Sequence, residues 1–158
     1  MFLDTETTGI GKDDKVVDLG VIDKDTNILI NILLQPNIPM PEGATAVNGI
    51  TDQMLKGCPN FAQVSSSVRK MLTGKTIIAW NSPFDKRMID NEFKNIGEEP
   101  PEYTWEDEMP MYGLYASKPK RNKLCYAAEE CGIVEEQSHR AVGDCQFTLK
   151  VLKHMANQ

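Results

Sequence analysis

The sequence predicts an α/β domain with a mixed five-stranded sheet flanked by helices. Two observations support this prediction. Three apolar, β-branched segments separated by short polar loops fill the first 35 residues, and later in the chain helical segments alternate with short strands. Consecutive strands joined by short loops form an antiparallel meander, whereas strands that alternate with helices pair in parallel. The pattern therefore favours a mixed sheet with helices on its faces.

The order of the elements follows from local signals. Strands are expected at residues 1–6, 16–23, 27–35, 76–80 and 103–105. The second has the alternation of a strand in Val17, Leu19 and Val21. Residues 36–41 form an irregular connection, and Thr51 caps a short helix that ends by Gly57. Longer helices are expected at residues 61–72, 83–96, 109–117, 123–131 and 141–155.

Length and composition indicate one domain over residues 1–158. The chain is 41% hydrophobic, which suits a substantial core, and it contains no long apolar run, internal repeat or low-complexity linker. We expect a soluble, cytoplasmic protein without a membrane partner. The cysteines form no Cys-x-x-Cys pair and are interpreted as reduced thiols, with disulfides as the weaker alternative: Cys58, Cys125, Cys131 and Cys145.

Two carboxylates lie two positions apart at the end of the first predicted strand, in Asp4-Thr5-Glu6. Side chains at this spacing leave the same face of a strand, so Asp4 and Glu6 converge. Neighbouring like charges raise each other's proton affinity unless a cation lies between them, and Mg²⁺ or Mn²⁺ suits an all-oxygen site. We interpret the pair as half of a metal site. Taken alone, it is also compatible with an exposed polar turn before Gly9.

A third carboxylate follows the fourth predicted strand. Asn81-Ser82-Pro83 ends that strand and starts a helix, which places Asp85 in the first helical turn. The helix dipole also favours an acid at this position, by roughly 0.3–1 kcal/mol, so Asp85 alone does not establish a site.

The last helix adds a fourth carboxylate. Asp144 shares a stripe with Phe147 and Val151, which places a charge on an otherwise apolar, inward-facing surface. A buried unpaired charge is costly, and a metal ion would remove the cost. His139 precedes Asp144 by five residues, which on a continuous helix would separate the two side chains by about 140°. We therefore expect His139 on the preceding loop, where it suits a general base better than a fixed ligand.

The set Asp4-x-Glu6, Asp85 and His139-x4-Asp144 resembles the DEDDh family of 3′→5′ exonucleases, which includes the proofreading subunit of bacterial DNA polymerase III, RNase T and exonuclease X. The similarity extends to three further segments and spans nearly the whole chain: Thr7-Thr8-Gly9, Val47-Asn48-Gly49-Ile50-Thr51 and Asn81-Ser82-Pro83-Phe84. One departure is Asn48, at a position that is often histidine in relatives, and this departure puts no catalytic role in doubt. The resemblance implies a ribonuclease H-like fold.

The resemblance also implies a site with two Mg²⁺ or Mn²⁺ ions. Asp4, Glu6 and Asp144 would hold the first ion, Asp4 would bridge to the second, and Asp85 would support the second through water. His139 would take the proton from the attacking water. The product would be a nucleoside 5′-monophosphate released from a 3′ end.

The expected partner is the 3′ end of a nucleic acid. In the family, backbone groups at the positions of Thr7 and Thr8 accept the terminal nucleotide, and the region of Asn81 lies beside the strand. The first motif looks more like DNA-directed relatives, so single-stranded DNA is favoured and RNA trimming is the alternative. A polymerase or repair protein is a further expected partner.

Two different functions compete with the exonuclease hypothesis. One is a nucleic-acid or polymerase-binding module without catalysis. Such a module would be expected to lack at least one of the five site residues, so the presence of all five disfavours it. The second is a metal-dependent phosphohydrolase of nucleotides or small phosphodiesters, which digestion of a labelled oligonucleotide would distinguish.

The charge balance limits how such a protein would bind. The net charge of −6 opposes broad contact with nucleic acid, but two divalent cations would bring it to −2 and place positive charge at the site. The basic run Lys118–Lys123 is the best candidate for an additional strand contact. A solvated loop is an equally weighted interpretation of that run.

Overall fold

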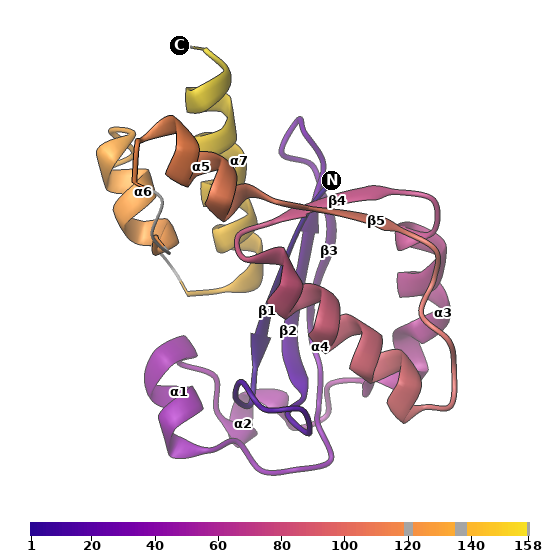
Figure 1. Cartoon of the computed structure of the whole chain (residues 1–158). Coiled ribbons are helices and arrows are strands. Elements are labelled where there is room, and N and C mark those ends of the chain that lie inside the picture. The colour runs from indigo at the N-terminus through magenta and orange to yellow at the C-terminus, as the bar shows by residue number, and fades with distance from the viewer. Residues whose placement is uncertain (119–121, 135–138, 158) are drawn as a thin grey trace.

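The computed structural model describes residues 1–118, 122–134 and 139–157. Its centre is a five-stranded sheet with the strand order β3-β2-β1-β4-β5, shown in Figure 1. The strands are β1 (Phe2–Thr7), β2 (Val16–Ile22), β3 (Ile28–Leu33), β4 (Thr76–Ala79) and β5 (Thr104–Asp107). Strands β1, β2 and β3 pair antiparallel, whereas β4 pairs in parallel with both β1 and β5. The predicted mixed sheet is therefore confirmed.

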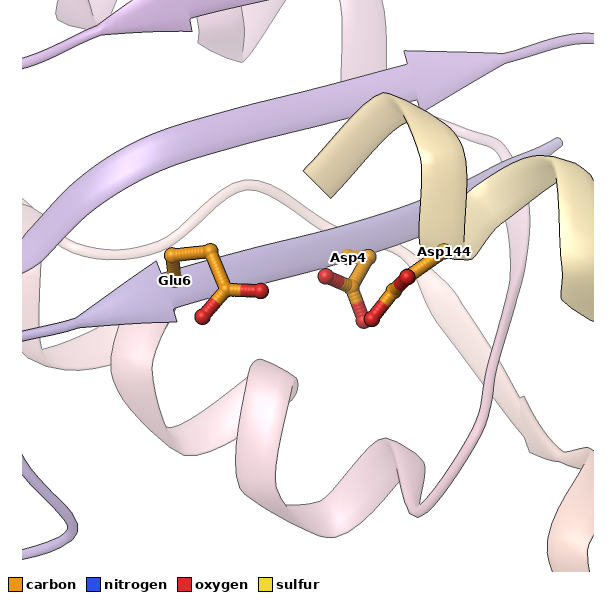
Figure 2. Close-up of side chains that lie close together, drawn as sticks. All are labelled: Asp4, Glu6 and Asp144. Carbon is orange, nitrogen blue, oxygen red and sulfur yellow. The ribbon is translucent and has the colours of Figure 1, made fainter. Parts of the chain in front are cut away.

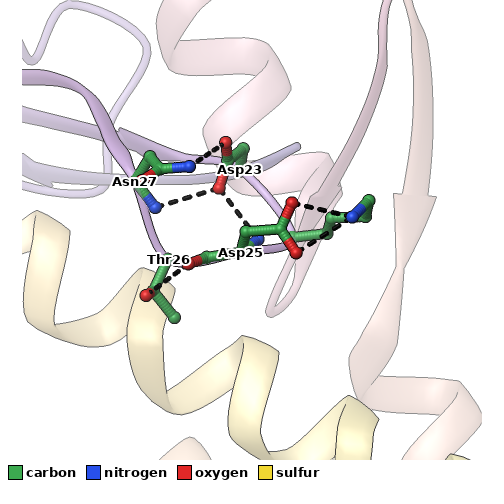
Figure 3. Close-up of polar contacts among 5 residues, drawn as sticks. Asp23, Asp25, Thr26 and Asn27 are labelled. Carbon is green, nitrogen blue, oxygen red and sulfur yellow. Dashed lines mark hydrogen bonds and ion pairs between the residues drawn. The ribbon is translucent and has the colours of Figure 1, made fainter.

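The turn between β2 and β3 is built by side-chain hydrogen bonds. Asp23 Oδ1 accepts from the backbone N–H groups of Asp25 and Asn27, and its Oδ2 accepts from the Asn27 amide, as Figure 3 shows. Thr26 adopts the left-handed region with φ of 70°. An aspartate that bonds the backbone just after itself stabilises a tight turn, which explains why the chain reverses here.

Helices cover both faces of the sheet. They are α1 (Glu42–Asn48), α2 (Asp52–Leu55), α3 (Phe61–Leu72), α4 (Ser82–Asn95), α5 (Glu108–Tyr115), α6 (Leu124–Glu130) and α7 (Ala141–Ala156). Helix α7 packs on β1 and β2, and α5 and α6 pack against α7 on that same side (Figure 1). Helices α3 and α4 cover the other face.

The alternation of β1 divides the core into two layers. Leu3 belongs to the cluster of α3 and α4, in which the rings of Phe61 and Phe93 meet edge to face at 5.0 Å. Phe2, on the opposite face, packs against Cys145 and Leu149 of α7. Because successive strand residues face opposite sides, one short strand supports both layers and directs its carboxylates toward α7.

The local signals locate most elements within one to three residues. Asn60 caps α3 through a reciprocal capping box with Gln63, and Thr51 caps α2 by accepting from Met54 N–H. Residues 36–41 are irregular, as expected, whereas helix α1, which follows them, was not predicted from the sequence. Its seven residues include Gly43 and Thr45, which are weak helix formers, and long-range contacts of Asn48 hold its end.

Two further findings concern the whole described chain. All four cysteines carry free thiols, as expected from their spacing. None of the described helices is long and apolar enough to cross a membrane.

Candidate active site

Three carboxylates meet where β1 passes beneath the first turns of α7. One oxygen from each of Asp4, Glu6 and Asp144 lies within 4.8 Å of the others. Figure 2 shows Asp4 and Glu6 leaving the same side of β1, with the carboxylate of Asp144 facing that of Asp4. The strand spacing that predicted convergence of the first pair is realised in the structure, and the third carboxylate comes from a helix more than 130 residues later in the sequence.

Two contacts with β2 bring the start of α7 close to the sheet. A Cβ at Gly20 would lie only 2.5 Å from the backbone of Ala141 and Val142, so only glycine permits this approach. Asp18 Oδ2 accepts from Ala141 N–H at 3.2 Å and from Arg140 Nε at 2.7 Å. Asp18 thus satisfies a backbone donor at the first turn of α7 from a neighbouring strand, a role usually filled by a residue of the helix's own chain segment.

Asp18 lies beside the site residues, and the sequence analysis did not identify it. It is 1% exposed and pairs with Glu6 in the β1–β2 ladder. A signal was present, because an aspartate interrupts the apolar run of the second predicted strand. A charge in a fully buried strand requires a partner, and here that partner is Arg140.

Asp85 lies beside the three carboxylates but outside the group formed by their nearest oxygens. It is buried in the first turn of α4, and its Oδ1 accepts from both Thr5 N–H at 3.0 Å and Thr5 Oγ1 at 2.7 Å. These bonds join α4 to the strand residue between Asp4 and Glu6. Asp85 therefore lies against β1 next to the trio, and its charge contributes to the raised pKa of Asp4.

Burial and mutual repulsion raise the proton affinity of the acids. Burial raises the pKa of Asp4 well above its ordinary value, and the charges of Asp85, Asp144 and Glu6 raise it further. Burial, followed by the charges of Asp144 and Asp18, raises the pKa of Glu6 to about 8. For Asp85, burial raises the pKa to about 7 although the bonds from Thr5 oppose that rise. Without a bound cation, the surroundings of these carboxylates therefore favour their protonated forms.

This donor set fits a divalent cation. The converging groups are all carboxylate oxygens, which Mg²⁺ and Mn²⁺ prefer, and a cation among them would remove the repulsion that raises their pKa values. Asp4, Glu6 and Asp144 are the residues placed to hold it, and Asp85 is the adjacent carboxylate.

His139 is exposed and lies outside α7, two residues before the helix begins. Its φ of 47° is in the left-handed region, which histidine adopts more readily than most residues. The expected position on the loop is therefore observed. The next residue, Arg140, is tied to Asp18, so the backbone on the helical side of His139 is anchored while its side chain faces solvent.

The hydroxyls of the two predicted substrate threonines bond within their own loop. Thr7 Oγ1 donates to Gly9 C=O, and Thr8 Oγ1 donates to Asp14 while accepting from Lys15 N–H. The backbone is also engaged, since Thr8 N–H donates to Lys15 C=O. These bonds order the segment that leaves β1.

Asn81 is the residue before α4 and adopts φ of 66°. Its N–H donates to Asp107 Oδ1, and its side chain makes no cap bond to the helix. Of the predicted basic run, residues 119–121 lie outside the described residues, whereas Lys118, Asn122 and Lys123 lie within them.

Comparison of the sequence with known proteins finds exonucleases. The RNase_T exonuclease family model matches residues 1–152. The chain is 32% identical over 169 residues to the uncharacterized exonuclease CP81 of Escherichia phage 186, covering 99% of this chain and 87% of that protein. It is 25% identical over 158 residues to the DNA polymerase III subunit epsilon of Treponema pallidum, covering 96% and 74%.

The fold is shared with a solved exonuclease. The zinc-bound complex of exonuclease I from E. coli with single-stranded DNA superposes with a TM-score of 0.84 at 21% identity, covering 99% of this chain and 40% of that chain. This likeness confirms the expected ribonuclease H-like fold. The resemblance of the motifs and the match of the family model agree, and the chain belongs to the RNase_T family of DEDD exonucleases, metal-dependent enzymes that hydrolyse phosphodiester bonds.

Proposed function

We propose that this protein is a 3′→5′ exonuclease that acts on single-stranded DNA and releases nucleoside 5′-monophosphates. The observation that carries the proposal is the approach of Asp4, Glu6 and Asp144 to within 4.8 Å on one side of β1. Carboxylates that cluster and raise one another's pKa values are arranged for metal ions rather than for stability. The choice of DNA is supported by the single-stranded DNA bound to the E. coli structural neighbour.

The chain's own residues have separable tasks in this reaction. Asp4, Glu6 and Asp144 would hold the first Mg²⁺ or Mn²⁺, and Asp4 with Asp85 would serve the second. When bound, such ions lower the pKa of water and neutralise charge on a leaving oxygen. His139, exposed at the start of α7, would accept the proton from the attacking water. Hydrolysis would break the bond between phosphorus and the 3′-oxygen of the preceding nucleotide.

The terminal nucleotide would lie against the segment that leaves β1. Thr7 and Thr8 are buried and fixed by bonds within their loop, which gives the backbone there a defined shape. Asn81, at the start of the helix that carries Asp85, would lie beside the strand. A polymerase or repair partner is proposed on the basis of the similarity to the polymerase subunit.

Digestion of a 5′-labelled single-stranded oligodeoxynucleotide tests the proposal. A ladder that shortens from the 3′ end in Mg²⁺ or Mn²⁺, and is absent in EDTA, is expected. Asp144→Asn should abolish the ladder, while Asp25→Asn, which changes an exposed turn, should not. Parallel digestion of matched RNA and duplex DNA tests the choice of substrate. Faster cleavage of RNA would identify RNA, rather than DNA, as the preferred substrate. Full activity in excess EDTA, or binding without cleavage, would overturn the proposal.

A further inference from the structure

A cavity of about 460 Å³ lies next to the candidate active site. It is lined by Trp80, Asn81, Met109, Asn122, Lys123 and Leu124. This volume lies within the range of about 300–1,000 Å³ that is typical of small-ligand pockets. The lining comes from the junction between β4 and α4 and from the starts of α5 and α6, so three segments of the chain form it.

The cavity lies at the same edge of the sheet as the three carboxylates. Phe2 of β1 pairs in parallel with Ile78 of β4, so both strands run toward the same edge. Asn81 follows β4 there, and Asp85 lies one helical turn farther along α4. One helical turn is about 5.4 Å long, so Asp85 lies close to Asn81 in the cavity wall.

The cavity also lies on the same face of the sheet as Asp144. Trp80 and Leu124 pack in the cluster that contains Phe147 of α7, and Phe147 follows Asp144 by one helical turn. Packed side chains therefore connect the helical turn of Asp144, through Phe147, to the cavity wall. The hydrogen bond from Trp80 Nε1 to Asn122 C=O, at 3.0 Å, holds the two sides of that wall together.

The lining has the groups that bind a nucleotide without regard to its sequence. Trp80 and Met109 offer apolar and aromatic surface to a base, and Asn81 carries an amide group; the Asn122 amide donates to Lys118 C=O and shapes the wall. Lys123 is exposed and brings a positive charge to a protein whose net charge is −6. Aromatic surface combined with a nearby cation is typical of single-strand binding.

On the basis of the proposed exonuclease function, we infer that this cavity binds the nucleotide on the 5′ side of the scissile bond, with its base against Trp80 and Met109 and a phosphate at Lys123. This assigns a substrate role to the described end of the basic run Lys118–Lys123. It also separates two subsites: the carboxylates act on the terminal nucleotide, and the cavity holds the strand behind it.

Two substrates separate the subsites in one experiment. The p-nitrophenyl ester of thymidine 5′-monophosphate has no upstream nucleotide and reports the carboxylate site alone, whereas 5′-fluorescein-labelled dT12 occupies both subsites. Lys123→Glu should raise KM for dT12 by about 5-fold at low salt, the size of an exposed ion pair. Hydrolysis of the small ester should stay within about 2-fold of wild type, because an exposed ion pair away from the reacting atoms contributes little there. Lys24→Glu, in the exposed turn at the opposite end of the sheet, is the matched control.

A second variant tests the cavity rather than its charge. Met109→Trp would fill the cavity. It should raise KM for dT12 and leave hydrolysis of the small ester unchanged. The binding of dT12 in EDTA, followed by fluorescence anisotropy, should show the same losses, and Lys123→Gln should lower the salt slope by about 0.7. Melting temperatures confirm that the variants fold.

The outcomes distinguish the cavity from the proposed function. Equal effects on both substrates, or no effect of Met109→Trp on dT12, would overturn the cavity as a subsite. If wild-type protein hydrolyses neither substrate, the proposed exonuclease function fails. In that case the anisotropy of wild type against Lys123→Glu and Met109→Trp still decides whether the cavity holds single-stranded DNA.

Discussion

The carboxylate of Asp18 on β2 accepts a hydrogen bond of 2.7 Å from Nε of Arg140, the residue between His139 and α7. Asp18 is 1% exposed, and the same oxygen accepts from Ala141 N–H. One buried strand residue thus fixes the start of the helix that carries Asp144 and anchors the backbone beside His139. Two residues of the candidate site depend on a side chain that would not itself contact substrate.

Asp18→Ala is expected to lower the free energy of unfolding by about 1.5–3 kcal/mol, because two bonds to a charged acceptor are lost. Removing Asp18 also relieves repulsion with Glu6, but Arg140 already offsets part of that repulsion, so the loss of bonds dominates. Urea unfolding measures the change. Asp25→Ala, at an exposed turn, should stay within about 0.5 kcal/mol. Equal effects of the two changes would mean that Asp18 does not hold α7.

The metal-free protein is expected to lose stability as pH rises from about 5 to 8. The pKa values of Asp4, Glu6 and Asp85 are raised in the folded state, to about 8 for Glu6 and about 7 for Asp85. The folded protein therefore binds more protons than the unfolded chain in this window, and the free energy of unfolding falls with rising pH. Melting temperatures in EDTA at pH 5, 6, 7 and 8 measure the slope.

Asp4→Asn is the variant for that measurement. It removes one repelling charge, so it should flatten the slope and melt above wild type at pH 8 in EDTA, while it abolishes nuclease activity. Mg²⁺ should stabilise wild type more than the variant. A melting temperature of wild type that rises from pH 5 to 8 in EDTA would show that the acids do not repel one another in the folded state.

His139→Ala is expected to reduce kcat by a factor of roughly 10² to 10⁴ while metal binding is retained, because a general base acts on the water and does not hold the ion. Calorimetric titration with Mn²⁺ and single-turnover kinetics separate the two effects. His154→Ala, on the last turns of α7, is the matched control and should leave kcat unchanged. A loss explained entirely by weaker Mn²⁺ binding would make His139 a ligand or a structural residue.

Glu108→Met is expected to stabilise the protein by about 1–3 kcal/mol at pH 7. Glu108 is the first residue of α5 and is fully buried, and neither carboxylate oxygen has a hydrogen-bond partner among the described residues. Burial, together with the charge of Asp107, raises its pKa to about 9. The group is therefore neutral at pH 7, and its stability cost grows as pH rises from the ordinary value of 4.5 to about 9.

Urea unfolding at pH 7 and pH 9.5 tests this expectation, and the gain from Glu108→Met should be larger at the higher pH. Glu106→Gln, at an exposed position of β5, should change the stability by less than about 0.5 kcal/mol at both values. Destabilisation by Glu108→Met would indicate that the carboxyl group makes a stabilising contact.

Local chemistry was sufficient for much of this protein. The strand periodicity of Val17, Leu19 and Val21 and the helix cap at Thr51 describe interactions between residues close in the chain. The convergence of Asp4 and Glu6 follows from the geometry of a single strand. Such features are determined by backbone stereochemistry, which a short segment already contains.

Only the tertiary structure decided how distant segments combine at the site. The capping of α7 by Asp18 and the approach allowed by Gly20 join β2 to a helix about 120 residues later, and no local pattern specifies that pairing. The bonds between Asp85 and Thr5 likewise join α4 to β1. Helix α1 is held in place because Asn48 bonds to Thr7 C=O. These outcomes depend on the packing of helices on a completed sheet, which brings together charges and small residues that are remote in sequence.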